Sequence, residues 1–195
     1  MRAYYNEFDP YAAQWLENLI AAGHLPQGDV DRRDMRTISY DEIRGYTQYH
    51  WFAGIGGWPL ALRLAGWPDD EPVWTGSCPC QPYSAAGQKK ADADKRNMWP
   101  CFRAFIQIFR PATVFGEQVA SKLGREWLSG VRLDLEALGY AVGAADLCAA
   151  GSGEKTQGRL GFEDNSFEWR KIVVGAPHIR QRVWWVAAAD RDWET

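Results

Sequence analysis

The chain has 195 residues, of which 46% are hydrophobic, so it is long and apolar enough for one domain with a substantial core. Its formal net charge of −3 argues against a generic electrostatic binder of nucleic acid. It contains no apolar stretch of about 20 residues and begins without a secretory signal, so we expect an intracellular, cytoplasmic protein with no membrane partner.

The four cysteines do not suggest the disulfide framework of a small secreted domain. A single proline separates Cys78 from Cys80, which is not the usual zinc spacing, and a site combining Cys148 with His178 stays open as an alternative.

Residues 1–72 hold 11 acids and 6 bases, whereas residues 73–195 hold 14 acids and 16 bases. A surface that faces nucleic acid should come from the second part, the alternative being an ordinary mixed surface.

Apolar spacing and turn residues predict alternating strands and helices, which is typical of an α/β fold with a mostly parallel sheet. We expect one domain over residues 1–195, with residues 151–174 as an insertion and residues 85–96 as a mobile loop. Strands are expected at residues 3–5, near residue 30, and at residues 49–52, 73–75, 112–115, 141–147 and 183–187, the late ones antiparallel. Helices are expected at residues 9–23, 41–44, 58–64, 99–109 and 127–138.

A glycine-rich turn joins the predicted strand at residues 49–52 to the following helix. Gly54, Gly56 and Gly57 would let a ligand approach the backbone and leave helix N-terminal amides free. The spacing lacks the G-x-G-x-x-G pattern of dinucleotide-binding proteins, which argues against NAD. A tight βα turn without a ligand is the alternative.

A cysteine follows the predicted strand at residues 73–75, in the segment Gly-Ser-Cys-Pro-Cys-Gln-Pro-Tyr-Ser that ends at Ser84. Open α/β sheets place their ligands at the carboxyl ends of strands. Cys80 lies just beyond such an end, and Pro79 stiffens the backbone before it. A partly exposed thiolate there would be a strong nucleophile, whereas a lone cysteine is usually a buried filler.

These segments resemble the cytosine-5 DNA methyltransferase family. Residues 52–57 resemble its cofactor motif F-x-G-x-G, and residues 76–84 resemble its nucleophile motif G-x-P-C-Q-x-F-S, with Tyr83 for Phe and one extra residue before Pro79. The resemblance implies a Rossmann-like fold of the methyltransferases that use S-adenosylmethionine (SAM).

Two later segments extend the resemblance. Residues 116–119 resemble the E-N-V motif with Gln118 for Asn, and residues 178–182 resemble Q-x-R-x-R with His178 for Gln. In the family, the cysteine adds to C6 of cytosine, the glutamate neutralises charge at N3, and arginines donate to O2. The resemblance therefore implies methylation of C5 of cytosine in DNA, with these catalytic residues: Cys80, Glu117, Arg180 and Arg182. Solvated surface charges are the alternative for the last three.

The order of the segments is unusual. The stretch between Gly57 and Cys80 is too short to carry the family's acids for the cofactor ribose and adenine, and similar segments stand at residues 6–12 and 28–30 instead. We infer a circular permutation, with residues 1–35 as the displaced cofactor segment. The implied cofactor contacts are Glu7 on the ribose, Phe8 stacked on adenine, Asp29 on the adenine amine, and Phe52, Gly54, Gly56, Gly57 and Pro79 elsewhere. An ordinary acid at a strand end is the alternative for Glu7.

The family's target-recognition domain and last motif are not evident, so DNA recognition by a second subunit, relaxed specificity, or a chain that is a fragment are all open. Such a form would suit a phage or restriction–modification element. The residues expected to contact DNA are Gln81, Ser84, Lys89, Lys90 and Arg96. Rival functions are a SAM-binding but weak or inactive regulatory or anti-restriction protein, an enzyme acting on free nucleotide, and a zinc-binding interaction module.

Overall fold

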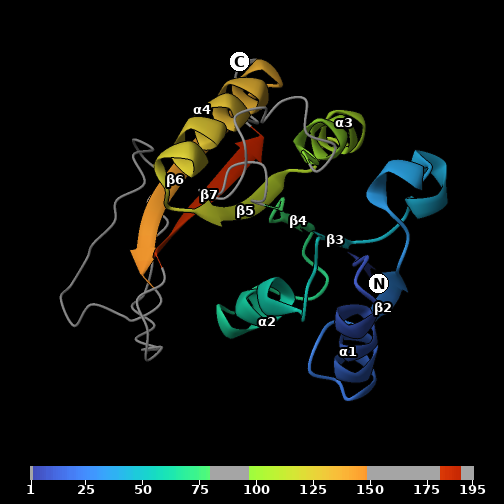
Figure 1. The fold of residues 1–195 in the computed structure, drawn as a ribbon. Coiled ribbons are helices and arrows are strands. Elements are labelled where there is room, and N and C mark those ends of the chain that lie inside the picture. Colours follow the sequence, from blue (N-terminus) through green and yellow to red (C-terminus); the bar gives the residue numbers. More distant parts are fainter. Residues whose placement is uncertain (1, 80–96, 149–180, 190–195) are drawn as a thin grey trace.

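One seven-stranded sheet organises the chain, with strands in the order β2-β1-β3-β4-β5-β7-β6 (Figure 1). The computed structural model describes residues 2–79, 97–148 and 181–189. The strands are β1 (Ala3–Asn6), β2 (Gly28–Asp31), β3 (Gln48–Trp51), β4 (Val73–Gly76), β5 (Thr113–Val119), β6 (Tyr140–Cys148) and β7 (Gln181–Ala189). Neighbours from β2 to β5 pair in parallel, and β7 runs antiparallel to both β5 and β6. The predicted α/β class, with a mostly parallel sheet and a late antiparallel part, is confirmed.

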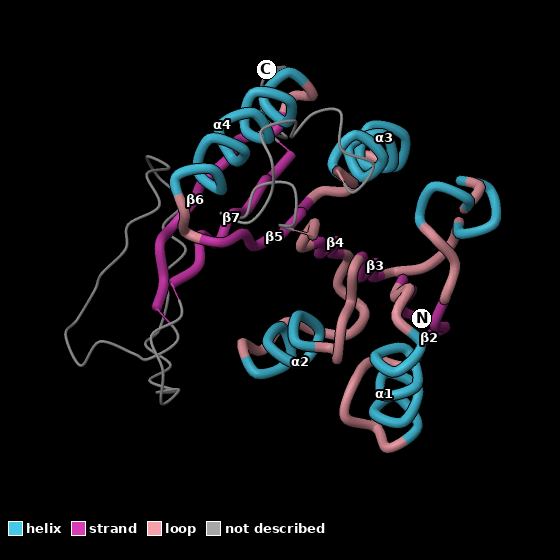
Figure 2. The backbone as a smooth tube through the Cα atoms, in the orientation of Figure 1, coloured by secondary structure: helices cyan, strands magenta, loops and turns pink. Residues whose placement is uncertain are grey.

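Helices cover both faces of this sheet. They are α1 (Pro10–Ala21), α2 (Gly57–Leu64), α3 (Trp99–Phe109) and α4 (Lys122–Ala137), with two short 3₁₀ helices, η1 (Met35–Thr37) and η2 (Tyr40–Ile43). Figure 2 shows α1 and α2 on one side of the strands and α3 and α4 on the other. Among the described residues, no helix has the length and apolar character needed to cross a membrane.

The strand order differs from the chain order in an informative way. In a classic doubly wound sheet, ordered 3-2-1-4-5-6, the first strand of the chain lies in the middle. Here the corresponding middle place belongs to β3, while β1 and β2 occupy the places of the second and third strands. This order is the one that the inferred circular permutation predicts, because the outer half of the sheet is made by the start of the chain.

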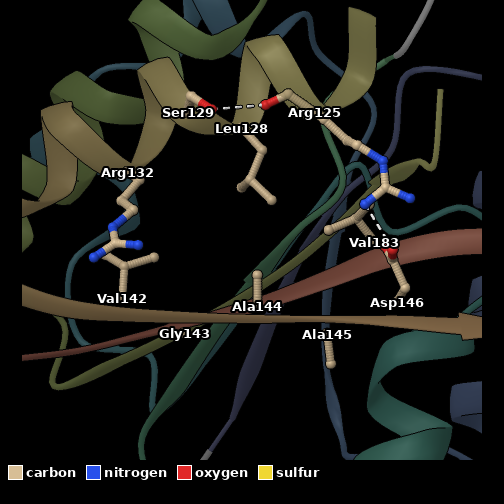
Figure 3. Close-up of a pocket in the computed structure, with 10 residues that line it drawn as sticks. All are labelled: Arg125, Leu128, Ser129, Arg132, Val142, Gly143, Ala144, Ala145, Asp146 and Val183. Carbon is tan, nitrogen blue, oxygen red and sulfur yellow. Dashed lines mark hydrogen bonds and ion pairs between the residues drawn. The ribbon is translucent and has the colours of Figure 1, made fainter. Parts of the chain in front are cut away.

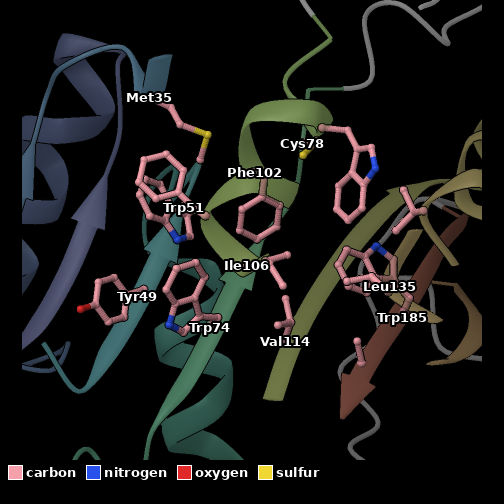
Figure 4. Close-up of a cluster of buried hydrophobic side chains, with 14 of the residues drawn as sticks. Met35, Tyr49, Trp51, Trp74, Cys78, Phe102, Ile106, Val114, Leu135 and Trp185 are labelled. Atoms are coloured by element: carbon pink, nitrogen blue, oxygen red, sulfur yellow. The ribbon is translucent and has the colours of Figure 1, made fainter. Parts of the chain in front are cut away.

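The core lies in two layers, one on each face. The larger layer faces α3 and α4 and is strongly aromatic, with Trp51, Trp74, Phe102 and Trp185 packed together (Figure 4). The smaller layer faces α1 and includes Tyr5, Leu16 and Leu25. In β1 alternate residues feed the two layers, with Tyr4 in the larger one and Ala3 and Tyr5 in the smaller one, as the two-residue period of a strand requires. Several of the eleven tryptophans therefore form the core.

Several boundaries differ from the predicted ones, and three of them show why. The helix expected from residue 127 begins at Lys122, because the Ser121 side chain caps it by accepting from the backbone of Gly124 at 3.0 Å. The strand expected at residues 112–115 runs from Thr113 to Val119, because β7 pairs with it over its whole length. The short helix expected to start at Asp41 is η2, which begins one residue earlier after Ser39.

Replacing Gly116 with alanine is expected to destabilise the fold. A Cβ at this position in β5 would overlap the indole of Trp185, which is only 2% exposed. Overpacking of this kind costs about 1–3 kcal/mol, which urea unfolding would measure. Gly130→Ala is the matched control: a Cβ there meets nothing within 4 Å, and alanine should stabilise the exposed part of α4 by up to about 1 kcal/mol. A Gly116 variant as stable as wild type would contradict this packing.

His50 should make stability depend on pH. The imidazole is fully buried, with Nδ1 2.9 Å from Thr75 Oγ1 and Nε2 3.3 Å from Gln48 Oε1. Burial lowers the pKa of His50 from 6.5 to about 3. Between these values the unfolded chain binds a proton at His50 that the folded chain does not, so the free energy of unfolding falls as pH falls, by up to about 1.4 kcal/mol per unit. Urea unfolding from pH 7 to pH 4 should show a shallower slope for His50→Gln; an equal slope would contradict the assignment.

Candidate active site at the carboxyl ends of β4 and β5

Glu117 and Arg182 form an ion pair across two neighbouring strands. Glu117 belongs to β5 and faces Trp184 of β7 in the ladder, while Arg182 faces Val119. Nε of Arg182 contacts Oε1 of Glu117, and the two side chains are 20% and 22% exposed, respectively. The residues that the sequence separates by more than sixty positions are thus brought together at one end of the sheet. Arg182 Nη1 also donates to the carbonyl of Gln181 at 2.9 Å.

This ion pair lies on the face of the sheet that carries α2. Phe115 and Trp184 alternate with buried residues of β5 and β7, and both rings pack against Trp58 of α2, with centroids 5.8 and 5.0 Å away. Glu117 is two residues after Phe115 and Arg182 two before Trp184, so they share that face. The glutamate therefore lies within a paired strand and not at a loose strand end, and both the backbone and the neighbouring rings restrict it.

The segment that precedes Cys80 starts beside this ion pair. β4 pairs with β5 through Thr75 and Phe115, so the residues that follow Gly76 reach the level of Glu117. Cys78 is 6% exposed and belongs to the aromatic core, and burial raises the pKa of its thiol. Figure 4 shows its sulfur among these core side chains. A buried thiol is a poor nucleophile, so Cys78 does not compete with Cys80 for that role.

The glycine loop after β3 has an unusual backbone. Phe52, predicted as part of the strand, lies just beyond it with φ of 52°, and Gly54 and Gly56 have φ of 55° and 84°. A non-glycine residue in this region is uncommon and costs on the order of 1–3 kcal/mol, so it often marks a functional turn. A Cβ at Gly54 or Gly57 would meet nothing within 4 Å among the described residues. The described residues therefore leave space beside the backbone at these two positions, and cofactor binding there stays a prediction.

Glu7 connects this loop with the beginning of the chain. It follows β1, its Oε2 accepts from the amide of Gly54 at 2.7 Å, and its Oε1 accepts from the amide of Asp9 at 2.8 Å. Phe8, next to it, is 68% exposed. A carboxylate, an exposed aromatic ring and an open glycine loop are the groups that a ribose, an adenine and the methionine part of SAM would need. The donor and acceptor groups of this region therefore fit SAM.

Asp29 lies farther from this carboxyl edge than the adenine assignment suggests. It is the second residue of β2, and its carboxylate accepts from Tyr46 OH at 2.8 Å and pairs with Arg2. The acid at the carboxyl end of β2 is Asp31, which is held by Arg33 and by Tyr4 OH at 2.8 Å. The contact between Asp29 and adenine stays a prediction, and Asp31 is a residue that the sequence analysis did not single out.

A hollow of about 330 Å³ lies between α4 and the strands β6 and β7 (Figure 3). Arg125 and Asp146 form an ion pair at 2.6 Å on its wall, and Leu128 and Val183 line it. Val183 is buried toward α4, whereas its neighbours in the strand, Arg182 and Trp184, face α2. The hollow is therefore on the opposite face from the ion pair of Glu117 and Arg182 and is not part of the candidate site.

Other predicted residues lie outside the described part of the chain. They are Cys80, Gln81, Ser84, Lys89, Lys90, Arg96 and Arg180, together with the 151–174 insertion and His178. In residues 2–79, 97–148 and 181–189, no group of three or more potential ligands could hold a metal ion. Two contributors were missed by the sequence analysis: Trp58, whose Nε1 donates to Ser77 Oγ at 3.0 Å, and Ser77 itself. Their positions inside or next to the two motifs are the signal that could have identified them.

Comparisons with known proteins were made for sequence and for structure. A family model described as C-5 cytosine-specific DNA methylase matches residues 67–160. No curated protein matched the sequence. DNMT2 of Spodoptera frugiperda is 13% identical with a TM-score of 0.45, over 100% of this chain and 52% of that chain. A protein described as a DNA modification methyltransferase from an E. coli prophage is 11% identical with a TM-score of 0.47, over 97% and 47%. Dnmt2 of S. pombe is 15% identical with a TM-score of 0.41, over 96% and 50%.

The chain thus spans about half the length of these solved structures. The family match takes in the segment that contains Cys80 and the strand that contains Glu117. The glycine loop and Arg182 lie outside the matched residues. The resemblance inferred from the motifs is confirmed, because the model of C-5 cytosine-specific DNA methylases matches this part of the chain.

Proposed function

We propose that this chain transfers a methyl group from SAM to C5 of cytosine in DNA, with Cys80 bonded covalently to the base during transfer. The observation that carries the proposal is the ion pair of Glu117 with Arg182, a carboxylate and a guanidinium held side by side. The pair lies beside the end of β4, from which the chain continues to Cys80. Ligands of open α/β sheets bind outside such carboxyl ends.

The methyl donor follows from the family, whose members use SAM. When bound, SAM supplies an electrophilic methyl group. Glu7 and Phe8 would hold its ribose and adenine, and the open backbone around Gly54 would hold its methionine part. Glu7 already fixes the amide of Gly54, so the ribose-binding carboxylate and the glycine loop are held together before any ligand arrives. Pre-organisation of this kind lowers the entropic cost of binding.

The reacting base needs three groups from the protein. The Cys80 thiolate would add to C6, which makes C5 enamine-like and able to take up the methyl group. A proton acceptor would then remove the C5 proton, which breaks the C6–S bond and releases the thiolate. Glu117 would carry a proton to N3 as the thiolate adds and take it back when the thiolate leaves, which neutralises the negative charge on the ring. Arg182 would donate to O2, and the ion pair keeps both side chains oriented before the cytosine enters. The cytosine must leave the stack of the duplex, at a cost of a few kcal/mol.

A comparison of acceptors tests the proposed substrate. Transfer of tritium-labelled methyl from SAM is measured with duplex DNA, single-stranded DNA, RNA and dCMP, and bisulfite sequencing locates the modified positions. We expect labelled 5-methylcytosine in DNA and none in dCMP. Label in dCMP alone would favour the enzyme acting on free nucleotide. SAM binding without label in any acceptor would favour the inactive regulatory protein, or a subunit that needs a partner for recognition.

A further inference from the structure

Trp58 joins three parts of the candidate site: the glycine loop, the segment after β4 that leads to Cys80, and the strands that contain the ion pair. It is the second residue of α2 and follows Gly57 of the glycine loop directly. Its indole Nε1 donates to Ser77 Oγ at 3.0 Å, and Ser77 stands three residues before Cys80. The indole therefore links the cofactor loop to the segment that contains the nucleophile.

The same ring also packs on the strands that contain the ion pair. Its centroid is 5.0 Å from that of Trp184 in an edge-on arrangement, with an interplanar angle of 77°, and 5.8 Å from that of Phe115. Trp184 lies directly opposite Glu117 in the ladder. A shift of the indole would therefore displace Ser77 on one side and Trp184, opposite Glu117, on the other.

We propose that Trp58 is a positioning residue, which sets the glycine loop relative to Ser77, at the start of the segment that leads to Cys80, and relative to Glu117 through Trp184. The inference rests on the proposed function. Methyl transfer requires the donor carbon, C5 and the thiolate to align, and a misplacement of about 1 Å can cost on the order of 100-fold in rate. The loss should therefore appear in kcat more than in the KM for SAM, because the groups that bind SAM are untouched.

The test uses two variants that break the hydrogen bond. Trp58→Phe keeps a smaller aromatic ring but no donor, and Ser77→Ala removes the acceptor alone. We expect each to lower kcat about tenfold, with the double variant no worse than either single one, because residues that act through one contact are not additive. Ser77→Thr, which restores a hydroxyl, should recover most of the activity.

Trp67→Phe is the matched control. Trp67 belongs to the same aromatic cluster, with its centroid 6.0 Å from that of Phe115, and its Nε1 donates to the carbonyl of Glu71 at 3.2 Å. The Trp67→Phe variant loses the same kind of donor, but the lost bond goes to Glu71 and not to Ser77. Its kcat should therefore stay near that of wild type even if thermal stability falls. Two results would overturn this inference alone: the same kcat for Trp58→Phe, Trp67→Phe and wild type, or a kcat for Ser77→Thr as low as that for Ser77→Ala. A wild-type protein that transfers no methyl group would instead defeat the proposed function, and this inference with it.

Discussion

Cys80→Ala is expected to abolish methyl transfer to DNA, with a loss of at least about 10⁴-fold in kcat. Without the thiolate, C6 receives no nucleophile and C5 stays unreactive toward the methyl donor. Losses of a nucleophile in other enzymes reach on the order of 10⁶-fold. The measurement is transfer of tritium-labelled methyl to DNA under saturating SAM, together with SAM binding, which should be unchanged because the glycine loop and Glu7 are intact.

Cys78→Ala gives the matched control, since it removes the same side chain two positions earlier. Cys78 is buried in the aromatic core, so the variant should lose some stability and keep its activity when assayed well below its unfolding temperature. Similar activities of the Cys80 variant and wild type would defeat the mechanism. A complete loss for Cys78→Ala in a folded protein would show that the nucleophile had been assigned to the wrong cysteine.

Glu117→Gln should lower kcat by roughly 10²–10³-fold, the range found when one group that stabilises developing charge is removed. The glutamine keeps the size of the side chain in β5, but it cannot give a proton to N3 and it breaks the ion pair with Arg182. The decrease should appear in single-turnover transfer to DNA, with SAM affinity preserved. We expect some loss of stability as well, because the pair is only about one fifth exposed and the change removes the charged partner of Arg182.

Glu136→Gln is a suitable control for this change. Glu136 also pairs with an arginine, Arg132, at 2.6 Å, but the pair is on α4 at the outer surface of the other face. This variant should transfer methyl at the wild-type rate. If Glu117→Gln were as active as Glu136→Gln, the ion pair with Arg182 would have no part in the chemistry.

Much of the fold could be predicted from the sequence because the pattern of each segment is local. The helix predicted at residues 99–109 agrees with the structure, and the strand order is consistent with the inferred circular permutation. The start of α4 was missed, since Ser121 does not stand out before a run of charged residues and its capping role depends on its bond to Gly124. The length of β5 was missed too, because its last residues are paired by β7 from the far end of the chain.

The candidate site, too, could be predicted only in part. Glu117 and Arg182 were predicted from motifs, and the ladder between β5 and β7 explains why they meet. The bond between Glu7 and Gly54 joins residues from two motifs that the permutation separates, and the sequence gives no sign of it. Trp58 was read only as the start of a helix, because its function depends on a hydrogen bond to another strand end. Motifs identify reacting groups, whereas supporting contacts depend on packing.

Covalent trapping on DNA that contains 5-fluorocytosine tests the central claim most directly. After methyl transfer, the fluorine at C5 cannot be removed as a proton, so the C6–S bond cannot break and the protein stays attached to the DNA. With SAM present, the wild-type protein and Cys78→Ala should give an adduct that survives denaturing electrophoresis, and peptide mapping should place the DNA on Cys80. Methyl transfer to ordinary DNA without any such adduct, or an adduct that persists in Cys80→Ala, would contradict the account.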